Sequence, residues 1–179
     1  MSEGLFEQDT DTFIITWNRL IVRHGPGTIR KKDGTILGYI KAGGMINRYI
    51  CILDIHHKTI IKSNKNKIHS YQYAVKDSAG NKIGTVYGKT AFSVKNDMKM
   101  KDEKGNKILE IKTNEKNQYE IYTHDGKLIA KDIAVSIKNS TDDASEFTIL
   151  DLNYDRQRLW GLYISFLSGF SDKSTVVPD

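Results

Sequence analysis

The segment Leu159–Phe170 constrains the fold most, because its twelve residues carry no charge in a chain of which 27% is charged. On a helical projection most of the circumference is covered by large apolar side chains: Leu159, Trp160, Leu162, Tyr163, Ile164, Phe166, Leu167 and Phe170. The remaining narrow face is shared by small residues: Gly161, Ser165, Ser168 and Gly169. A helix that is apolar all round must be enclosed by other elements. At about 1.5 Å per residue it spans roughly 18 Å, too short for the ~30 Å core of a bilayer. The segment therefore predicts a buried core helix in a protein without a transmembrane span.

Before this helix, a tight turn followed by an extended apolar run repeats along the chain. The turns contain Asp-Gly, Gly-Asn or related pairs, which supply the positive φ angles of hairpins. They lie at residues 33–34, 77–81, 102–106 and 125–126, with a degenerate copy at 54–58. The flanking sequence alternates as half-buried strands do, as in Tyr71, Tyr73 and Val75. Five hairpins, with further runs at Phe13–Trp17 and Phe147–Leu150, predict about twelve strands.

Sequential hairpins can close into an antiparallel barrel, which leaves no exposed strand edge. A parallel solenoid is the alternative for repeats of this length. A barrel of about twelve strands has a lumen too wide for strand side chains alone to fill, and the apolar helix would fill it. We therefore predict a mainly β protein: a closed antiparallel β-barrel of about twelve strands that encloses a hydrophobic C-terminal α-helix. We expect the barrel over residues 13–170, its helix over about 156–170, a disordered N-terminal tail over 1–12 and a C-terminal tail over 171–179.

Positive charge is concentrated in the middle of the chain. Residues 58–116 have a net charge of +8, whereas residues 1–57 have +1 and residues 117–179 have −4. A basic segment is typical of proteins that bind an anionic partner, such as a phospholipid surface or a nucleic acid, although lysines also cover the solvent face of ordinary strands. The candidate ligands of a lipid headgroup are lysines of this segment: Lys58, Lys62, Lys65, Lys67, Lys95, Lys99 and Lys101. Few aromatic residues are interleaved with them for base stacking, which disfavours nucleic acid.

The sequence has no motif of a known catalytic or cofactor site. It lacks a Walker motif, a dinucleotide glycine fingerprint and a nucleophile elbow. His56 and His57 are neighbours in a predicted turn, where their side chains should point apart, so we expect no metal site. The single cysteine, Cys51, lies in an apolar run and should be a buried small hydrophobe. The single cysteine, together with the absence of a signal sequence in residues 1–11, predicts a reducing, intracellular location. The absence of catalytic and cofactor motifs predicts a protein that is neither an enzyme nor dependent on a cofactor.

Several short motifs resemble the family of tubby-like C-terminal domains that includes phospholipid scramblases and the LURP-one-related proteins. Tyr119–Tyr122 with Asp125–Lys131 resembles the penultimate hairpin of the family. Asp151–Arg156 followed by Leu159–Leu162 resembles the entry to its central helix. Asp33–Tyr39 and Asp77–Val86 resemble its earlier turns. The resemblance covers residues 13–170 and implies a twelve-stranded barrel around a buried C-terminal helix.

The resemblance implies several functions, because family members bind phosphoinositides, have been assigned lipid scrambling or act in signalling. We expect a non-catalytic cytoplasmic domain, peripheral at membranes, that binds anionic phospholipid headgroups or a protein partner. One alternative is a scramblase-like protein that moves lipids, and a second is a nucleic-acid-binding protein. Unlike scramblases, this chain has no long proline-rich N-terminal arm and no cysteine cluster. After the predicted helix its only acidic residues are Asp172 and Asp179, too few for a calcium loop.

Overall fold

The computed structural model describes residues 5–6, 9–17, 27–44, 48–66, 71–88, 97–135 and 143–173, with residues 143 and 169–173 described by their backbone alone. These residues contain twelve strands and one helix. The strands are β1 (Thr12–Trp17), β2 (Gly27–Arg30), β3 (Ile36–Gly43), β4 (Tyr49–Leu53), β5 (Thr59–Lys65), β6 (Gln72–Asp77), β7 (Lys82–Gly88), β8 (Met98–Lys101), β9 (Lys107–Thr113), β10 (Tyr119–Thr123), β11 (Leu128–Val135) and β12 (Asp143–Ile149). The helix is α1 (Arg156–Lys173).

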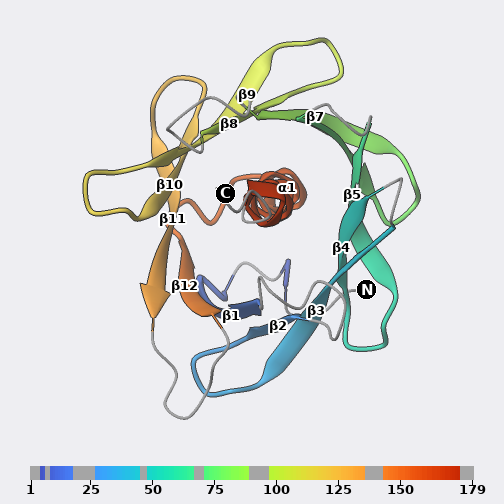
Figure 1. The fold of residues 1–179 in the computed structure, drawn as a ribbon. Helices are drawn as coiled ribbons and strands as arrows, with labels where there is room; N and C mark the ends of the chain where they lie inside the picture. Colours follow the sequence, from blue (N-terminus) through green and yellow to red (C-terminus); the bar gives the residue numbers. More distant parts are fainter. Residues whose placement is uncertain are drawn as a thin grey trace, which may run out of the picture.

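The strands form a closed antiparallel meander. Each strand pairs with its neighbours in the sequence, and β1 pairs with β12 from Thr12↔Thr148 to Trp17↔Asp143, which closes the barrel. Figure 1 looks along the barrel and shows α1 inside the ring of strands. The predicted barrel with an enclosed C-terminal helix is therefore confirmed, and the solenoid alternative is wrong.

Five hairpin turns of similar design lie at one end of the barrel. In three of them, which begin at Asp54, Asp77 and Asp102, Oδ1 of the first residue accepts hydrogen bonds from two amides of its own turn. Asp102, for example, accepts from Lys104 at 2.9 Å and Asn106 at 2.8 Å. The chain then passes through a residue with positive φ, such as Gly105 at 85°. His57 takes this position in the 54–58 turn, with φ of 61°. The strand register shifts beside each of the five turns, as a bulge requires.

The N-terminal segment contributes to the core. Leu5 has 1% of its surface exposed, and a Cβ placed on Gly38 would lie 2.8 Å from Leu5 Cδ1. β1 begins at Thr12, one residue before the predicted start of the barrel. The boundaries of the predicted tails stay a prediction, since much of both tails lies outside the described residues.

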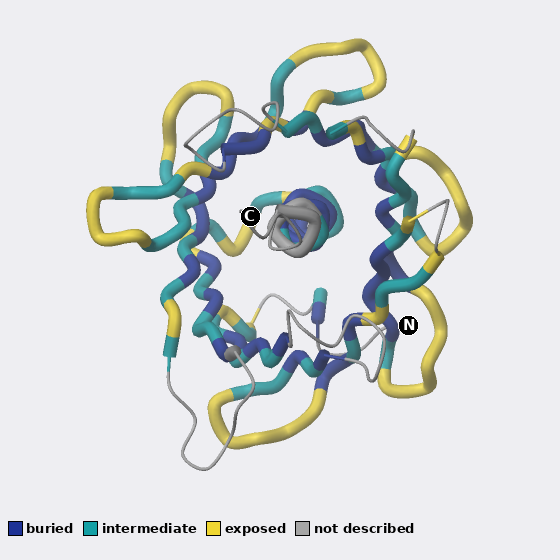
Figure 2. The backbone as a smooth tube through the Cα atoms, in the orientation of Figure 1, coloured by how far each residue is buried: buried dark blue, intermediate teal, exposed yellow. Residues whose placement is uncertain are grey.

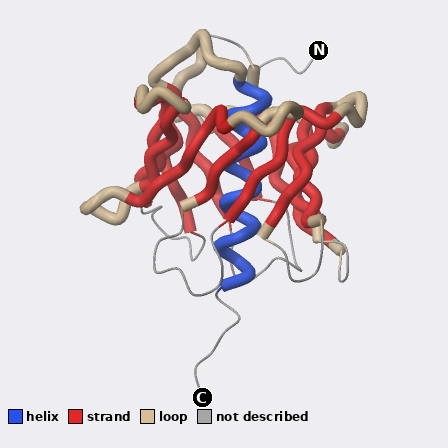
Figure 3. Tube along the Cα trace, turned by 90° about the horizontal axis from the view of Figure 1, so that it is seen from above, coloured by secondary structure: helices blue, strands red, loops and turns tan. Residues whose placement is uncertain are grey.

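Helix α1 starts at the residue predicted from the sequence and ends at Lys173, three residues beyond the predicted end. Asp155 caps it, because its Oδ1 accepts hydrogen bonds from the amides of Gln157 at 3.0 Å and Arg158 at 3.3 Å. The helix enters at the end of the barrel that carries the five hairpin turns and runs through to the opposite end (Figure 3). Arg158, which lies in its first turn, donates from Nε to the Ile83 carbonyl and contacts Asp155.

The bulky side of α1 packs on aromatic side chains of the barrel. Trp160 lies between Phe13 and Phe147, with ring centroids 5.1 and 5.0 Å away. Phe147 also stacks on Tyr163 at 4.4 Å. The predicted core residues Leu159, Trp160, Leu162, Tyr163 and Phe166 are at most 2% exposed. Leu167 is partly buried against them, and the side chain of Phe170 lies outside the described residues.

The small-residue side of α1 lies against β5 and β6. A Cβ on Gly161 would lie 2.5 Å from Val75 Cγ1, so only glycine fits at this separation. One turn later, Ser165 Oγ donates to the Gly161 carbonyl at 2.7 Å and lies 2.6 Å from Ser63 Oγ. The backbone of α1 is correspondingly closer to β4–β9 than to the remaining strands. Figure 2 shows the buried residues lining the inside of the barrel and the helix that fills it.

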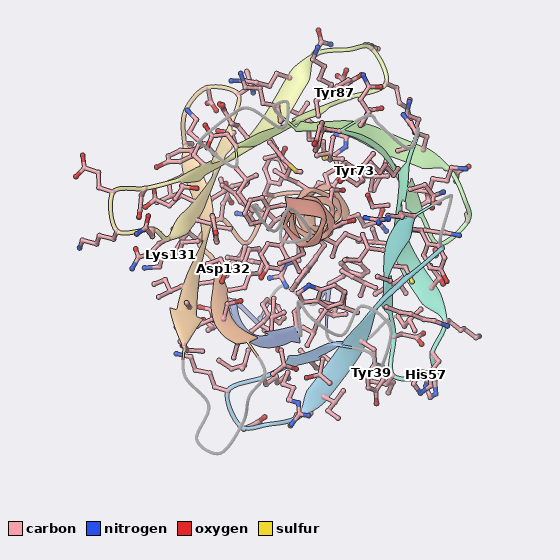
Figure 4. All side chains as sticks on the ribbon, viewed as in Figure 1. Tyr39, His57, Tyr73, Tyr87, Lys131 and Asp132 are labelled. Atoms are coloured by element: carbon pink, nitrogen blue, oxygen red, sulfur yellow. The ribbon has the colours of Figure 1, made fainter. Side chains whose placement is uncertain are left out.

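A buried polar cluster fixes the other side of the helix. The Tyr163 hydroxyl donates to Asp132 Oδ2 at 2.8 Å and lies 3.2 Å from Ser145 Oγ. Burial, and then the charge of Asp132, raise the pKa of Tyr163 well above its ordinary value of 10.0. Strand alternation sends Asp132 into the barrel and the neighbouring Lys131 outward (Figure 4).

Candidate anion-binding wall

Strand alternation decides which lysines of the basic segment reach the outer surface. On β5, Ile61 and Ser63 are fully buried against the helix, so Lys62 between them points outward. On β6, Tyr73 and Val75 are buried in the same way, and Lys76 points outward. Figure 4 shows Tyr73 directed towards the helix, whereas Tyr87 on β7 belongs to the outer layer.

Six outward lysines on β3–β8 form a surface that we call the basic wall: Lys41, Lys62, Lys76, Lys82, Lys99 and Lys101. The strand register aligns four of them in one row across β3–β7. Lys41 pairs with Cys51, Cys51 with Lys62, Lys62 with Lys76, and Lys76 with Lys82. Like charges that face each other across neighbouring strands repel, so this row has a cost for the isolated protein.

Two lysines of the basic wall lie over tyrosine rings. Lys62 Nζ is 4.6 Å from the centroid of the Tyr49 ring, and Lys101 Nζ is 5.1 Å from that of Tyr87. The ring holds each ammonium group by its quadrupole without neutralising the charge. Tyr49 itself lies over the backbone of β3, since a Cβ on Gly43 would come within 2.7 Å of Tyr49 Oη.

Lys99 differs from the other wall lysines because a carboxylate partly neutralises it. Glu110 on β9 has Lys107 at 3.2 Å, Lys112 at 3.4 Å and Lys99 at 3.7 Å. Burial alone would raise the pKa of Glu110, but the hydrogen bond from Lys107 and the charge of Lys112 outweigh it and lower this pKa. The cluster therefore has three ammonium groups around one ionised carboxylate and keeps a net positive charge.

The structure separates the lysines that the sequence grouped as candidates. Lys62, Lys99 and Lys101 lie together on the basic wall. Lys58 is exposed in the turn between β4 and β5, where its amide donates to Asp54 Oδ1 at 2.9 Å. Lys65 belongs to the inward series of β5, after Ile61 and Ser63, and its Nζ lies 5.6 Å from the centroid of the Tyr71 ring. Burial, followed by the charge of Arg48, lowers the pKa of Lys65. Lys67 and Lys95 lie outside the described residues.

Three wall lysines were absent from the sequence-based set: Lys41, Lys76 and Lys82. They escape a search for local clusters, because each stands alone in its own strand and meets the others only across the sheet. A hairpin turn could have revealed two of them. Counting outward from the turn at residues 77–81 pairs Lys76 with Lys82.

The described residues contain no group of three or more His, Cys, Asp or Glu side chains that could hold a metal ion. Within the same part of the chain, no helix has both the length and the apolar character needed to cross a membrane. Cys51 is 3% exposed, and burial raises the pKa of its thiol above the ordinary 9.0.

The sequence and the fold are both similar to those of known proteins. A sequence profile of the family described as LURP-one-related matches residues 57–176, from the turn before β5 to the end of α1, which is more than half of the chain. The chain belongs to the LURP-one-related family. LURP-one-related domains have the tubby-like fold, in agreement with the resemblance inferred from the turns and the helix entry.

A solved structure has a similar fold over nearly the whole chain, including the first four strands. The crystal structure of an Arabidopsis thaliana protein superposes with a TM-score of 0.56, covering 97% of this chain and 98% of the other. The two sequences are 12% identical, so the likeness concerns the fold alone. No curated protein matches the sequence.

Proposed function

We propose that this LURP-one-related chain is a non-catalytic domain that binds anionic phospholipid surfaces peripherally through the basic wall. The observation that carries the proposal is the row of Lys41, Lys62, Lys76 and Lys82. None of the four forms an ion pair with a described residue. An anionic surface would relieve the repulsion between them, and each lysine near such a membrane contributes about 1 kcal/mol.

Co-sedimentation with phosphatidylcholine vesicles of increasing phosphatidylserine content tests this proposal. Lys62→Glu/Lys76→Glu removes two wall lysines worth together about 2 kcal/mol, so binding should weaken at least about 30-fold. The matched control is Lys104→Glu/Lys116→Glu, which makes the same change in net charge at two exposed turn lysines away from the row. Equal weakening by both pairs would show that only net charge matters and would refute the basic wall as the site.

Ionic strength gives a second test. The contact is Coulombic, so binding should weaken as added salt shortens the ~10 Å screening length. Absence of vesicle binding even at low salt would refute the proposal.

A dye-quenching assay in the same vesicles separates binding from lipid movement. We expect no accelerated lipid flipping, with or without calcium, and rapid flipping would favour the scramblase-like alternative. Tighter binding of single-stranded RNA or DNA than of vesicles would favour the nucleic-acid alternative.

A further inference from the structure

We propose that the barrel lies side-on at the bilayer, with its axis parallel to the membrane plane and β5–β7 against the headgroups. This inference rests on the proposed lipid binding and adds the orientation of the bound domain. It follows from how charge and aromatic groups are distributed over the faces of the barrel.

The lysines of the basic wall are spread over a broad area of the outer surface. Neighbouring strands lie about 4.8 Å apart, so the row from Lys41 to Lys82 extends over roughly 19 Å of the outer surface. Beside this row, the register aligns Tyr49 with three short side chains, Asn64, Ala74 and Thr85. Headgroups can thus approach β6 closely at the centre of the lysine-bearing side.

Tyrosines on this side give a second reason for a side-on contact. Tyr49 and Tyr87 are half-buried on the outer surface, each beside a wall lysine. Tyrosine rings collect at the headgroup level of membrane proteins, where their apolar body and polar hydroxyl are both accommodated. The two tyrosine–lysine pairs of the basic wall, Tyr49 with Lys62 and Tyr87 with Lys101, therefore match the chemistry of the lipid interface.

The end with the five hairpin turns has no excess of positive charge, because its turns carry six carboxylates against five lysines over residues 31–35, 54–58, 77–81, 102–106 and 123–127. Each of these turns carries an aspartate: Asp33, Asp54, Asp77, Asp102 and Asp125. The amide hydrogen bond from Thr35 lowers the pKa of Asp33, and that from Asn106 lowers the pKa of Asp102. The carboxylates of Asp33 and Asp102 therefore stay ionised near a membrane, and an end-on approach would bring them against lipid phosphates.

The opposite side of the barrel carries fewer basic residues than the basic wall. The outer face of β1 and β2 carries Ile14, Thr16, Thr28 and Arg30, and Arg30 Nε donates to Thr28 Oγ1 at 3.1 Å. On β11, Lys131 points outward. On β12, Glu146 is paired with Lys32 at 3.5 Å. Binding through this side would leave the row from Lys41 to Lys82 in water, without an anionic partner.

Site-specific quenching tests the orientation in the full chain. A neutral environment-sensitive fluorophore is attached to single cysteines introduced in a Cys51→Ala background, and the vesicles carry a lipid with a nitroxide in its headgroup. The label sites are Ala74 on β6, Thr148 on β12, Ser78 in the turn after β6, and Lys116 in the turn between β9 and β10 at the other end of the barrel. Gln72, also exposed on β6, serves as a second site if the Ala74 variant folds poorly.

We expect quenching several-fold stronger at Ala74 or Gln72 than at the other three sites. Strongest quenching at Ser78 or Lys116 would show an end-on contact and overturn the orientation, as would equal quenching at Ala74 and Thr148. In each of these results co-sedimentation persists, so only the orientation fails. Loss of co-sedimentation by the labelled and unlabelled proteins alike would overturn the lipid binding and the orientation together.

Discussion

The close contact between Gly161 and Val75 predicts that the effect of Gly161→Ala on the free energy of unfolding depends on the side chain at residue 75. A Cβ at residue 161 would lie 2.5 Å from Val75 Cγ1, a separation that packed atoms do not tolerate. Overpacking of this kind costs about 1–3 kcal/mol. Alanine is also a better helix former than glycine by about 1 kcal/mol, which opposes that cost. We therefore expect Gly161→Ala to change the free energy of unfolding by between about zero and 2 kcal/mol in the destabilising direction.

A double-mutant cycle isolates the contact from helix propensity. In a Val75→Ala background Cγ1 is absent, so Gly161→Ala should stabilise the protein by about 1 kcal/mol. The propensity gain is the same in both backgrounds, and the difference between them, about 1–3 kcal/mol, measures the contact. Val86→Ala is the matched control, because Val86 is a buried valine on β7 and the three atoms nearest to the added Cβ all belong to Val75.

Equilibrium unfolding in urea, followed by the fluorescence of the buried Trp17 and Trp160, provides the assay. For a urea m value of about 2 kcal/mol/M, a coupling of about 2 kcal/mol appears as a difference of about 1 M in the midpoint shifts. If Gly161→Ala has the same effect in the two backgrounds to within about 0.5 kcal/mol, the helix does not press against β6 and the packing argument is wrong.

Three further predictions concern the buried cluster, the turns and the cysteine. Tyr163→Phe removes the hydrogen bond to the buried Asp132 and should lower the free energy of unfolding by about 1–3 kcal/mol, and an unchanged urea midpoint would contradict this role. Because the amide of Asn106 lowers the pKa of Asp102 below 3.8, its stabilisation is present above that pH and is lost as pH falls through the folded-state pKa. Asp102→Asn should therefore flatten the decline of the urea midpoint between about pH 5 and about pH 3, and parallel declines would contradict the argument. Burial raises the pKa of Cys51, so its thiol should react slowly with a disulfide reagent in the native protein and rapidly in urea; fast native reaction would be inconsistent with this.

The fold could be predicted because two local signals agree with each other. The segment Leu159–Phe170 has no polar face, and turns such as Asp102–Asn106 fix where hairpins reverse. Together they predict a closed barrel that encloses one helix. The burial of Leu5 could not be predicted in the same way, since the apolar pair Leu5 and Phe6 stands in an acidic segment without periodic apolar neighbours to support it.

The candidate site was only partly predictable, because outer-face neighbours come from different strands. Lys62 and Lys76 are fourteen positions apart in sequence yet face each other across β5 and β6. The bulges beside the turns shift the register by one residue, and a count that omits them misplaces side chains. Lys99 was grouped with the other candidates because no local pattern shows that Glu110 lies opposite it. Whether these lysines bind lipid stays a prediction.

The late position of helix α1 in the chain has a consequence for how the protein is made. Its hydrogen bonds reach far back in sequence, with Ser165 bonded to Ser63 across 102 residues and Arg156 to Leu5 across 151. Such distant contacts form slowly, because the chain pays the entropy of closing long loops before it gains their stabilisation. A nascent chain that has completed β12 but not α1 has every strand and nothing to fill the lumen. During that interval the inward side chains of the strands are exposed to other chains, so the yield of folded protein should depend on how fast the eighteen residues of the helix are synthesised.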